Sequence, residues 1–221
     1  MLYSTYIGGG SDDKSHDMKL DSSNNIVITG VTNSIDFFVT ESSTKYSSNT
    51  DYDAFLLKLS ANGSTYLFST YIGGSSDDEA WSLALDPSNN IYITGYTGSN
   101  NFPTTQDLVD NFLGENGFIS IYSAENELLS SVTIGGSSVE FLNQIYIDNE
   151  GTIIVIGDTL SDDFPTTSDC YSCDLGGRRD LILFKLNWVS KDPVASSFPL
   201  EIFLLTLLSI PILSRIKRRR V

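Results

Sequence analysis

Hydrophobic and polar positions alternate in short runs along most of the chain, and clusters of Gly, Asn, Asp and Ser separate the runs. Typical examples are Ile26–Thr32, Ile91–Thr97 and Ile153–Thr159, each rich in β-branched residues. Short runs of this character predict β-strands. No segment before residue 190 has the pattern of a long amphipathic helix, so the chain is predicted to be all-β.

The same runs return three times at nearly constant spacing. Tyr6-Ile7-Gly8-Gly9 recurs at residues 71–74 and, in reduced form, at residues 133–136, which are 65 and then 62 residues further along. Each unit of about 63 residues contains up to four predicted strands. Antiparallel four-stranded units repeated in one phase predict β-propeller blades, whose faces are buried only by their neighbours.

The predicted strands divide residues 1–187 into three blades, at about 8–72, 73–134 and 135–187. Within them, the expected strands are 15–20, 26–32, 54–60 and 66–72; 80–85, 91–97, 117–123 and 128–134; and 142–147, 153–159 and 181–187.

The third blade lacks an outer strand, and the N-terminus has one to spare. Residues 2–7 match residues 67–72, so they are the candidate strand that closes a ring against the last blade. Three blades are fewer than the usual four to eight. Three interpretations stay open: a homo-oligomer that completes a six-bladed ring, an open three-blade fragment, or an N-terminally truncated fragment of a larger propeller protein. The lack of a signal peptide before Tyr3 favours the last.

The recurring motifs also suggest a family. YSTYIGGSSDDEAWSLALDPSNNIYITGYT, followed by NFPTT, and DAFLLKLSANGS in the preceding unit resemble the SBBP-type β-propeller repeats of secreted and surface proteins of bacteria and archaea. The resemblance spans residues 1 to about 187 and implies an architecture and a location, because no general catalytic residue set comes with this repeat. The third unit departs from the pattern, since Asp77-Asp78 becomes Val139-Glu140.

Charge is distributed unevenly between the repeats and the C-terminus. The chain carries 28 acidic and 13 basic residues, a net charge of -15. Five of the basic residues lie within the last seven positions, and the remaining body is acidic enough to repel phosphate backbones, so no nucleic-acid partner is expected. The five basic residues are Arg215, Lys217, Arg218, Arg219 and Arg220.

An apolar segment directly precedes this basic cluster. After a linker at 188–197, residues 198–214 are predicted to form a transmembrane helix, and the basic tail at 215–221 places the C-terminus in the cytoplasm and the repeats outside the cell. A packed core helix is an alternative, and a cleaved sorting-type tail is another. The predicted membrane-anchor residues are Phe198, Ile202, Phe203, Leu204, Leu205, Leu207, Leu208, Ile210, Ile212 and Leu213.

The loops that follow the outer strand and the second strand of each blade are expected on one face of the ring. Asp12, Asp13, Asp77 and Asp78 gather near that rim, with Glu140 as the third unit's counterpart. Oxygen-rich loops of this kind are weak candidates for calcium, although their spacing does not match a defined calcium loop. The alternative is a solvated acidic rim that keeps a surface protein soluble.

Other repeated residues have structural interpretations. Asp21, Asp86 and Asp148 each open a hairpin turn. The glycines at 30, 95 and 157 fall inside strands and predict bulges or close backbone approach. The Phe-Pro-Thr-Thr copies at residues 102–105 and 164–167, with a degenerate version at 37–40, are interpreted as plugs that pack a long loop against its blade, and Trp81 as a core residue.

Cys170 and Cys173 form a single C-x-x-C in a polar loop. A structural zinc site would need two further ligands in a chain with one histidine. A disulfide and two unremarkable thiols stay open as interpretations.

These observations predict a non-catalytic, membrane-anchored cell-surface β-propeller that binds an extracellular protein or glycan, as an adhesion or scaffold module, through its loop-bearing face. The alternative from another class is an extracellular polysaccharide hydrolase or lyase with acidic rim residues as general acid and base. No catalytic residue is assigned, and no cofactor is expected apart from the calcium candidates.

Overall fold

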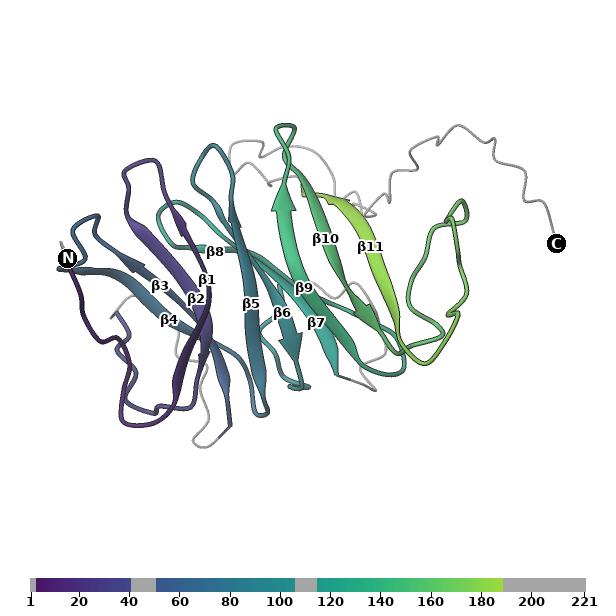
Figure 1. Ribbon diagram of the computed structural model, residues 1–221, viewed down its shortest axis with the longest axis horizontal. Coiled ribbons are helices and arrows are strands. Elements are labelled where there is room, and N and C mark those ends of the chain that lie inside the picture. The colour runs from purple at the N-terminus through teal and green to yellow at the C-terminus, as the bar shows by residue number, and fades with distance from the viewer. Residues whose placement is uncertain (1–2, 41–50, 106–114, 189–221) are drawn as a thin grey trace, which may run out of the picture.

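The computed structural model describes residues 3–40, 51–105 and 115–188, and all regular structure in these ranges is β (Figure 1). Two four-stranded antiparallel sheets, in the orders β1-β2-β3-β4 and β5-β6-β7-β8, are followed by a three-stranded sheet in the order β11-β10-β9. The predicted all-β fold of antiparallel four-stranded units is therefore confirmed. The three sheets stand in a row like propeller blades, and the row is not closed into a ring.

Each strand predicted within the three blades is present, with its ends shifted by at most two residues. The strands are β1 (Asp13–Leu20), β2 (Ile26–Thr32), β3 (Asp53–Leu59), β4 (Tyr66–Ile72), β5 (Asp78–Leu85), β6 (Ile91–Thr97), β7 (Asn116–Tyr122), β8 (Leu128–Ile134), β9 (Glu140–Ile147), β10 (Thr152–Thr159) and β11 (Asp180–Asn187).

The turn between the first two strands of each blade depends on one aspartate. Asp21 Oδ1 accepts hydrogen bonds from the backbone N–H groups of Ser23 and Asn25, and Asp86 and Asp148 make the same pair of bonds in their own turns. The residue three positions after each aspartate has a positive φ; these residues are Asn24, Asn89 and Gly151. The predicted turn role of the three aspartates is confirmed.

The glycine in each second strand faces a bulge in the inner strand. The ladder between β1 and β2 skips His16, and the ladder between β5 and β6 skips Trp81. A Cβ on Gly30 would lie 2.0 Å from the carbonyl oxygen of Lys14, and the equivalent distances for Gly95 and Gly157 are 1.9 and 2.2 Å. The prediction of close backbone approach at these glycines is confirmed.

Successive blades are held together by apolar faces and by polar contacts between inner strands. Leu56 of β3 and Phe118 of β7 lie in the cluster between the first two sheets, while Ile119 and Leu142 lie in the cluster between the second and third. The carboxylate of Asp17 in β1 accepts hydrogen bonds from Ser82 Oγ and Leu83 N in β5, at 3.2 and 3.0 Å. Neighbouring blades are therefore fixed at their inner edges as well as across their faces.

The Phe-Pro-Thr-Thr elements pack as predicted. Phe102 is buried with its ring centroid 4.7 Å from that of Phe118, and Phe37 contacts Phe55 at 4.8 Å. In the third blade, Phe164 contacts Phe184 at 6.1 Å. Each phenylalanine thus fixes the long loop that follows the second strand onto its own blade.

The first and last blades lie at opposite ends of the row, so the prediction that residues 2–7 close a ring within one chain is wrong. Residues 3–9 form no strand, and the Tyr3 hydroxyl donates a hydrogen bond to the Gly63 carbonyl in the β3–β4 turn. In Figure 1 this N-terminal segment lies beside β3 and β4, at the opposite end of the row from β11. Three blades therefore leave residues 3–7 too far from the last blade to complete it.

The predicted C-terminal anchor lies outside the described residues. Within the ranges that the structure describes, no helix is long and apolar enough to cross a membrane. The linker, the transmembrane segment at 198–214 and the basic tail stay predictions from the sequence.

Replacing Gly95 by alanine tests the bulge. The new Cβ would overlap the Glu79 carbonyl oxygen, which is backbone and cannot rotate away, so we expect a loss of about 2–3 kcal/mol in the free energy of unfolding. Gly177→Ala is the matched control, because its nearest atom would be 3.7 Å away. Urea unfolding of both variants measures the difference, and equal midpoints would contradict the close approach.

Candidate functional site

The loop-bearing face is assembled by connections between consecutive units. The connectors that lead from the N-terminal segment or an outer strand to the next inner strand are residues 8–12, 73–77 and 135–139. Each is fixed to the loop that follows the second strand of its blade: Gly10 N donates to Asp36 Oδ1, Ser75 N to Asn101 Oδ1 and Ser137 N to Asp163 Oδ1, at 2.7–2.9 Å. The predicted gathering of these two sets of loops on one face is confirmed.

One carboxylate at the start of each inner strand organises its connector. Asp13, Asp78 and Glu140 accept hydrogen bonds from the backbone N–H groups of Gly9, Gly74 and Gly136, at 2.8, 2.7 and 3.0 Å. A serine from the second-strand loop, Ser34, Ser99 or Ser161, donates to the same carboxylates. We call each of these three carboxylates, which belong to Asp13, Asp78 and Glu140, a connector carboxylate.

The third unit keeps the connector carboxylate despite its divergent sequence. Glu140 is fully buried and accepts bonds from Gly136 N and from the Thr159 and Ser161 hydroxyls. The extra methylene of glutamate still allows the bonding pattern of Asp13. At this position the three units are therefore equivalent, which the change from Asp78 to Glu140 had not suggested.

Of the calcium candidates, two aspartates belong to this structural network and two lie on the rim. Asp13 and Asp78 bind their connectors, whereas Asp12 and Asp77 are exposed and both contact Tyr52. The Tyr52 N–H donates to Asp77 Oδ1 at 2.9 Å, and the Tyr52 hydroxyl donates to Asp12 Oδ2 at 3.3 Å. Among the described residues, no group of three or more His, Cys, Asp and Glu side chains is arranged to hold a metal ion. Calcium stays a prediction from the sequence.

The first two glycines of each connector have no room for a side chain. A Cβ on Gly73 would lie 2.3 Å from Asp53 Oδ1, and one on Gly135 would lie 2.1 Å from Asn116 Oδ1 and 2.2 Å from Glu140 Oε2. The Gly-Gly signature is therefore explained by polar side chains that converge on the connector from two strands.

An aromatic cluster lies at the loop-bearing end of the boundary between the second and third blades. Trp81 of β5, Tyr96 of β6 and Phe141 of β9 are each partly exposed, with ring centroids 5.5–6.3 Å apart. The Arg179 guanidinium lies 4.7 Å from the Phe141 centroid. We call these three rings the axial aromatic cluster, because they project from the first two strands of their blades, which in a closed propeller line the central channel.

Carboxylates border the axial aromatic cluster. Trp81 Nε1 donates to Glu79 Oε2 at 2.8 Å. Burial, together with a hydrogen bond to Glu115 and the charge of that residue, raises the pKa of the Tyr96 hydroxyl. The surface thus combines stacking faces with hydrogen-bonding groups of both charges, a composition suited to ligand binding.

The sequence interpretation missed this cluster because it treated Trp81 alone and as core. A signal was present: Tyr96 occupies the position of Val31 and Asp158 in the other units, and Phe141 that of Lys14 and Glu79. Aromatic residues that replace unlike residues at repeated positions mark a surface specific to one blade boundary.

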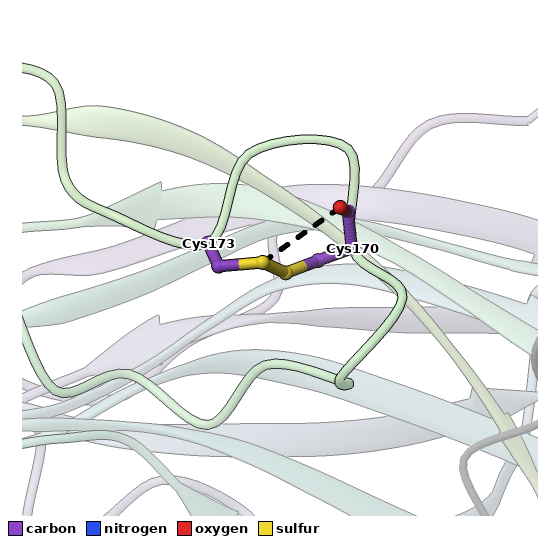
Figure 2. The surroundings of a disulfide bond; sticks show 2 residues. All are labelled: Cys170 and Cys173. Carbon is purple, nitrogen blue, oxygen red and sulfur yellow. Dashed lines mark hydrogen bonds between the residues drawn. A yellow bond between two sulfur atoms is a disulfide. The ribbon is translucent and has the colours of Figure 1, made fainter.

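Cys170 and Cys173 form a disulfide within the loop between β10 and β11 (Figure 2). The bridge closes a short loop in which the Sγ of Cys173 lies 3.7 Å from the Cys170 carbonyl oxygen. Of the sequence interpretations, the disulfide is the one observed.

Comparison with known proteins supports the repeat assignment. Residues 67–103 match the family model SBBP, described as a beta-propeller repeat. The matched segment runs from β4 through β5 and β6 to the Phe-Pro element, and so contains one connector carboxylate, one bulge and one plug. No curated protein matches the chain.

Burial of Asp78 predicts a pH dependence of stability. Desolvation raises the pKa of this carboxyl from 3.8 to about 6, against the hydrogen bonds from Thr97, Ser99 and Gly74 that lower it. Since the folded state holds this proton more tightly than the unfolded state, the stabilisation is complete below pH 3.8 and is lost as the pH rises through 6. Lowering the pH from 7 to 5 should add on the order of 1 kcal/mol through this group.

The Asp78→Asn variant isolates that contribution. We expect the difference in unfolding free energy between wild type and variant to change by on the order of 1 kcal/mol between pH 7 and pH 5. Urea titrations at both pH values measure it. Parallel pH profiles for the two proteins would contradict the assignment.

Proposed function

We propose that this protein is a non-catalytic cell-surface module that binds an extracellular glycan through the loop-bearing face, at the axial aromatic cluster. The observation that carries the proposal is the partly exposed stack of Trp81, Tyr96 and Phe141 beside Glu79 and Arg179. Sugar rings present apolar C–H faces and hydroxyl edges, so aromatic faces with adjacent carboxylates and a guanidinium complement both. Adhesion or scaffolding by protein binding is the broader form of the same proposal.

The location outside the cytoplasm has two supports. The Cys170–Cys173 disulfide is typical of an oxidising compartment. The apolar segment at 198–214, followed by five basic residues, predicts a single-pass anchor with the repeats outside. We therefore place the loop-bearing face in the extracellular medium, with the membrane as a second partner.

The hydrolase alternative has less support. Asp78 has a raised pKa, as a general acid requires, but its side chain is fully buried and accepts the Gly74 N–H. That position suits a structural group, and the binding function is therefore preferred.

Trp81→Ala tests the binding site. We expect its affinity on an array of bacterial cell-wall and capsular polysaccharides to fall about tenfold, the effect of losing one stacking platform of about 1–1.5 kcal/mol. Tyr171→Ala is the control, because Tyr171 is fully exposed in the β10–β11 loop and belongs to no ring contact described above. Equal affinities, with thermal unfolding unchanged in both variants, would reject the site, and wild-type binding to none of the polysaccharides would reject the glycan.

Topology is tested on intact cells. Protease added outside should digest the repeat domain and leave a protected C-terminal fragment that contains the basic tail. A repeat domain that resists external protease and fractionates with the cytosol would contradict the proposed location.

A further inference from the structure

The last blade exposes apolar side chains at positions that are buried in the other two. Leu183 of β11 is 63% exposed, whereas the equivalent Leu56 of β3 and Ile119 of β7 are 0% and 2% exposed because the next blade covers them. Tyr146 of β9 is likewise 62% exposed, against 8% for the equivalent Ala84. We call the face that each blade turns toward the next blade its forward face, and the opposite one its backward face. The forward face of the third blade has the apolar composition of a face that packs against another blade.

The first blade also exposes apolar side chains, on the face that points away from the second blade. Met18 and Leu20 of β1 are 54% and 53% exposed. The residue equivalent to Met18 in β5, Leu83, is 1% exposed, and the residue equivalent to Leu20 in β9, Ile147, is 9% exposed. The row therefore begins with a backward face and ends with a forward face, each without the neighbour that covers its equivalents inside the row.

The edge of the third sheet is open in the same way. Among residues 3–40, 51–105 and 115–188, no strand pairs with the outer edge of β11, although β3 and β7 are paired there by β4 and β8. Residues 2–7, Leu-Tyr-Ser-Thr-Tyr-Ile, have the sequence of an outer strand, but residues 3–7 form no strand. Tyr6 is fully exposed, whereas the equivalent Tyr71 in β4 is 1% exposed.

We propose that two copies of this chain join head to tail. Residues 3–7 of each copy are added as the outer strand on β11 of the other, and the forward face of each third blade packs against the backward face of the partner's first blade. Both contacts follow from one placement, because residues 8–12 join residues 3–7 to β1 as residues 73–77 join β4 to β5. Two such junctions close a ring of six blades, within the usual range of four to eight.

The register of the exchanged strand follows from the other blades. In the first blade Ala54 pairs with Ile72, Phe55 with Tyr71 and Leu56 with Thr70. By the same offsets, Leu181 pairs with Ile7, Ile182 with Tyr6 and Leu183 with Thr5 of the second copy. Strand addition at an open sheet edge supplies main-chain hydrogen bonds, and the paired faces supply the apolar burial.

A second copy is favoured over this chain's own C-terminal residues as the occupant. Residues 189–221 contain no Gly-Gly connector and no Phe-Pro-Thr-Thr element, so they do not have the sequence of a fourth blade. Residues 3–7 are held in the described contacts by little more than the Tyr3–Gly63 hydrogen bond and the partial burial of Ile7, so few interactions are lost when they leave.

Cysteine cross-linking between two differently tagged copies of the chain tests the exchange. One chain carries Thr5→Cys and the other Leu183→Cys, and the two are coexpressed in membranes under oxidising conditions, so that directly opposed thiols form a disulfide as the chains assemble; Cys170 and Cys173 are already paired. We expect a product of twice the chain mass that contains both tags. The control pairs Thr5→Cys with Leu128→Cys, because Leu128 is 38% exposed on an outer strand remote from β11.

The cross-linking results distinguish a second copy from the same chain as the source of the strand on β11. A mixed-tag product that forms several-fold more with Leu183→Cys than with Leu128→Cys supports the exchange. Equal yields for both pairs, no product, or a cross-link within one chain when Thr5→Cys and Leu183→Cys are combined in a single chain would overturn it. Because this readout is independent of glycan binding, failure of the assembly and failure of the proposed function are distinguishable.

Discussion

The fold depends on the hydrogen bond from a connector glycine N–H to the carboxylate that opens the next inner strand. This bond joins one unit to the next, because the connector follows the outer strand of one blade and the carboxylate begins the following blade. The serine that donates to the same carboxylate fixes the long loop of the second strand. One acidic group in each blade thus fixes both the connector from the preceding unit and the loop on the proposed binding face.

The repeated architecture leaves apolar faces uncovered at the two ends of the row. Inner blades cover each other's apolar faces, whereas Met18 at one end and Leu183 at the other remain exposed within a single chain. In the proposed head-to-tail assembly, these two uncovered faces cover each other. The axial aromatic cluster forms where the units differ in sequence, at Tyr96 and Phe141. Identical units would instead present the same surface at every blade boundary.

Much of the fold could be predicted because strand periodicity and turn chemistry are local properties. Asp21, Gly30 and the Phe-Pro-Thr-Thr plugs were all interpreted correctly from their positions in the repeat. The role of Asp78 and Glu140 could not be predicted, since it depends on a serine more than twenty residues away that the fold brings beside them. The axial aromatic cluster was missed for the same reason: Trp81 and Phe141 meet only when two blades stack.

The most direct test of the connector carboxylate is native-state hydrogen exchange at Gly74 and Gly136. Their N–H groups lie in loops, yet each donates to a fully buried carboxylate. We predict that both amides exchange only through opening of the blade, with protection comparable to that of amides in the central strands. Exchange at the rate of an unprotected loop amide would show that the connectors do not hold the blades together.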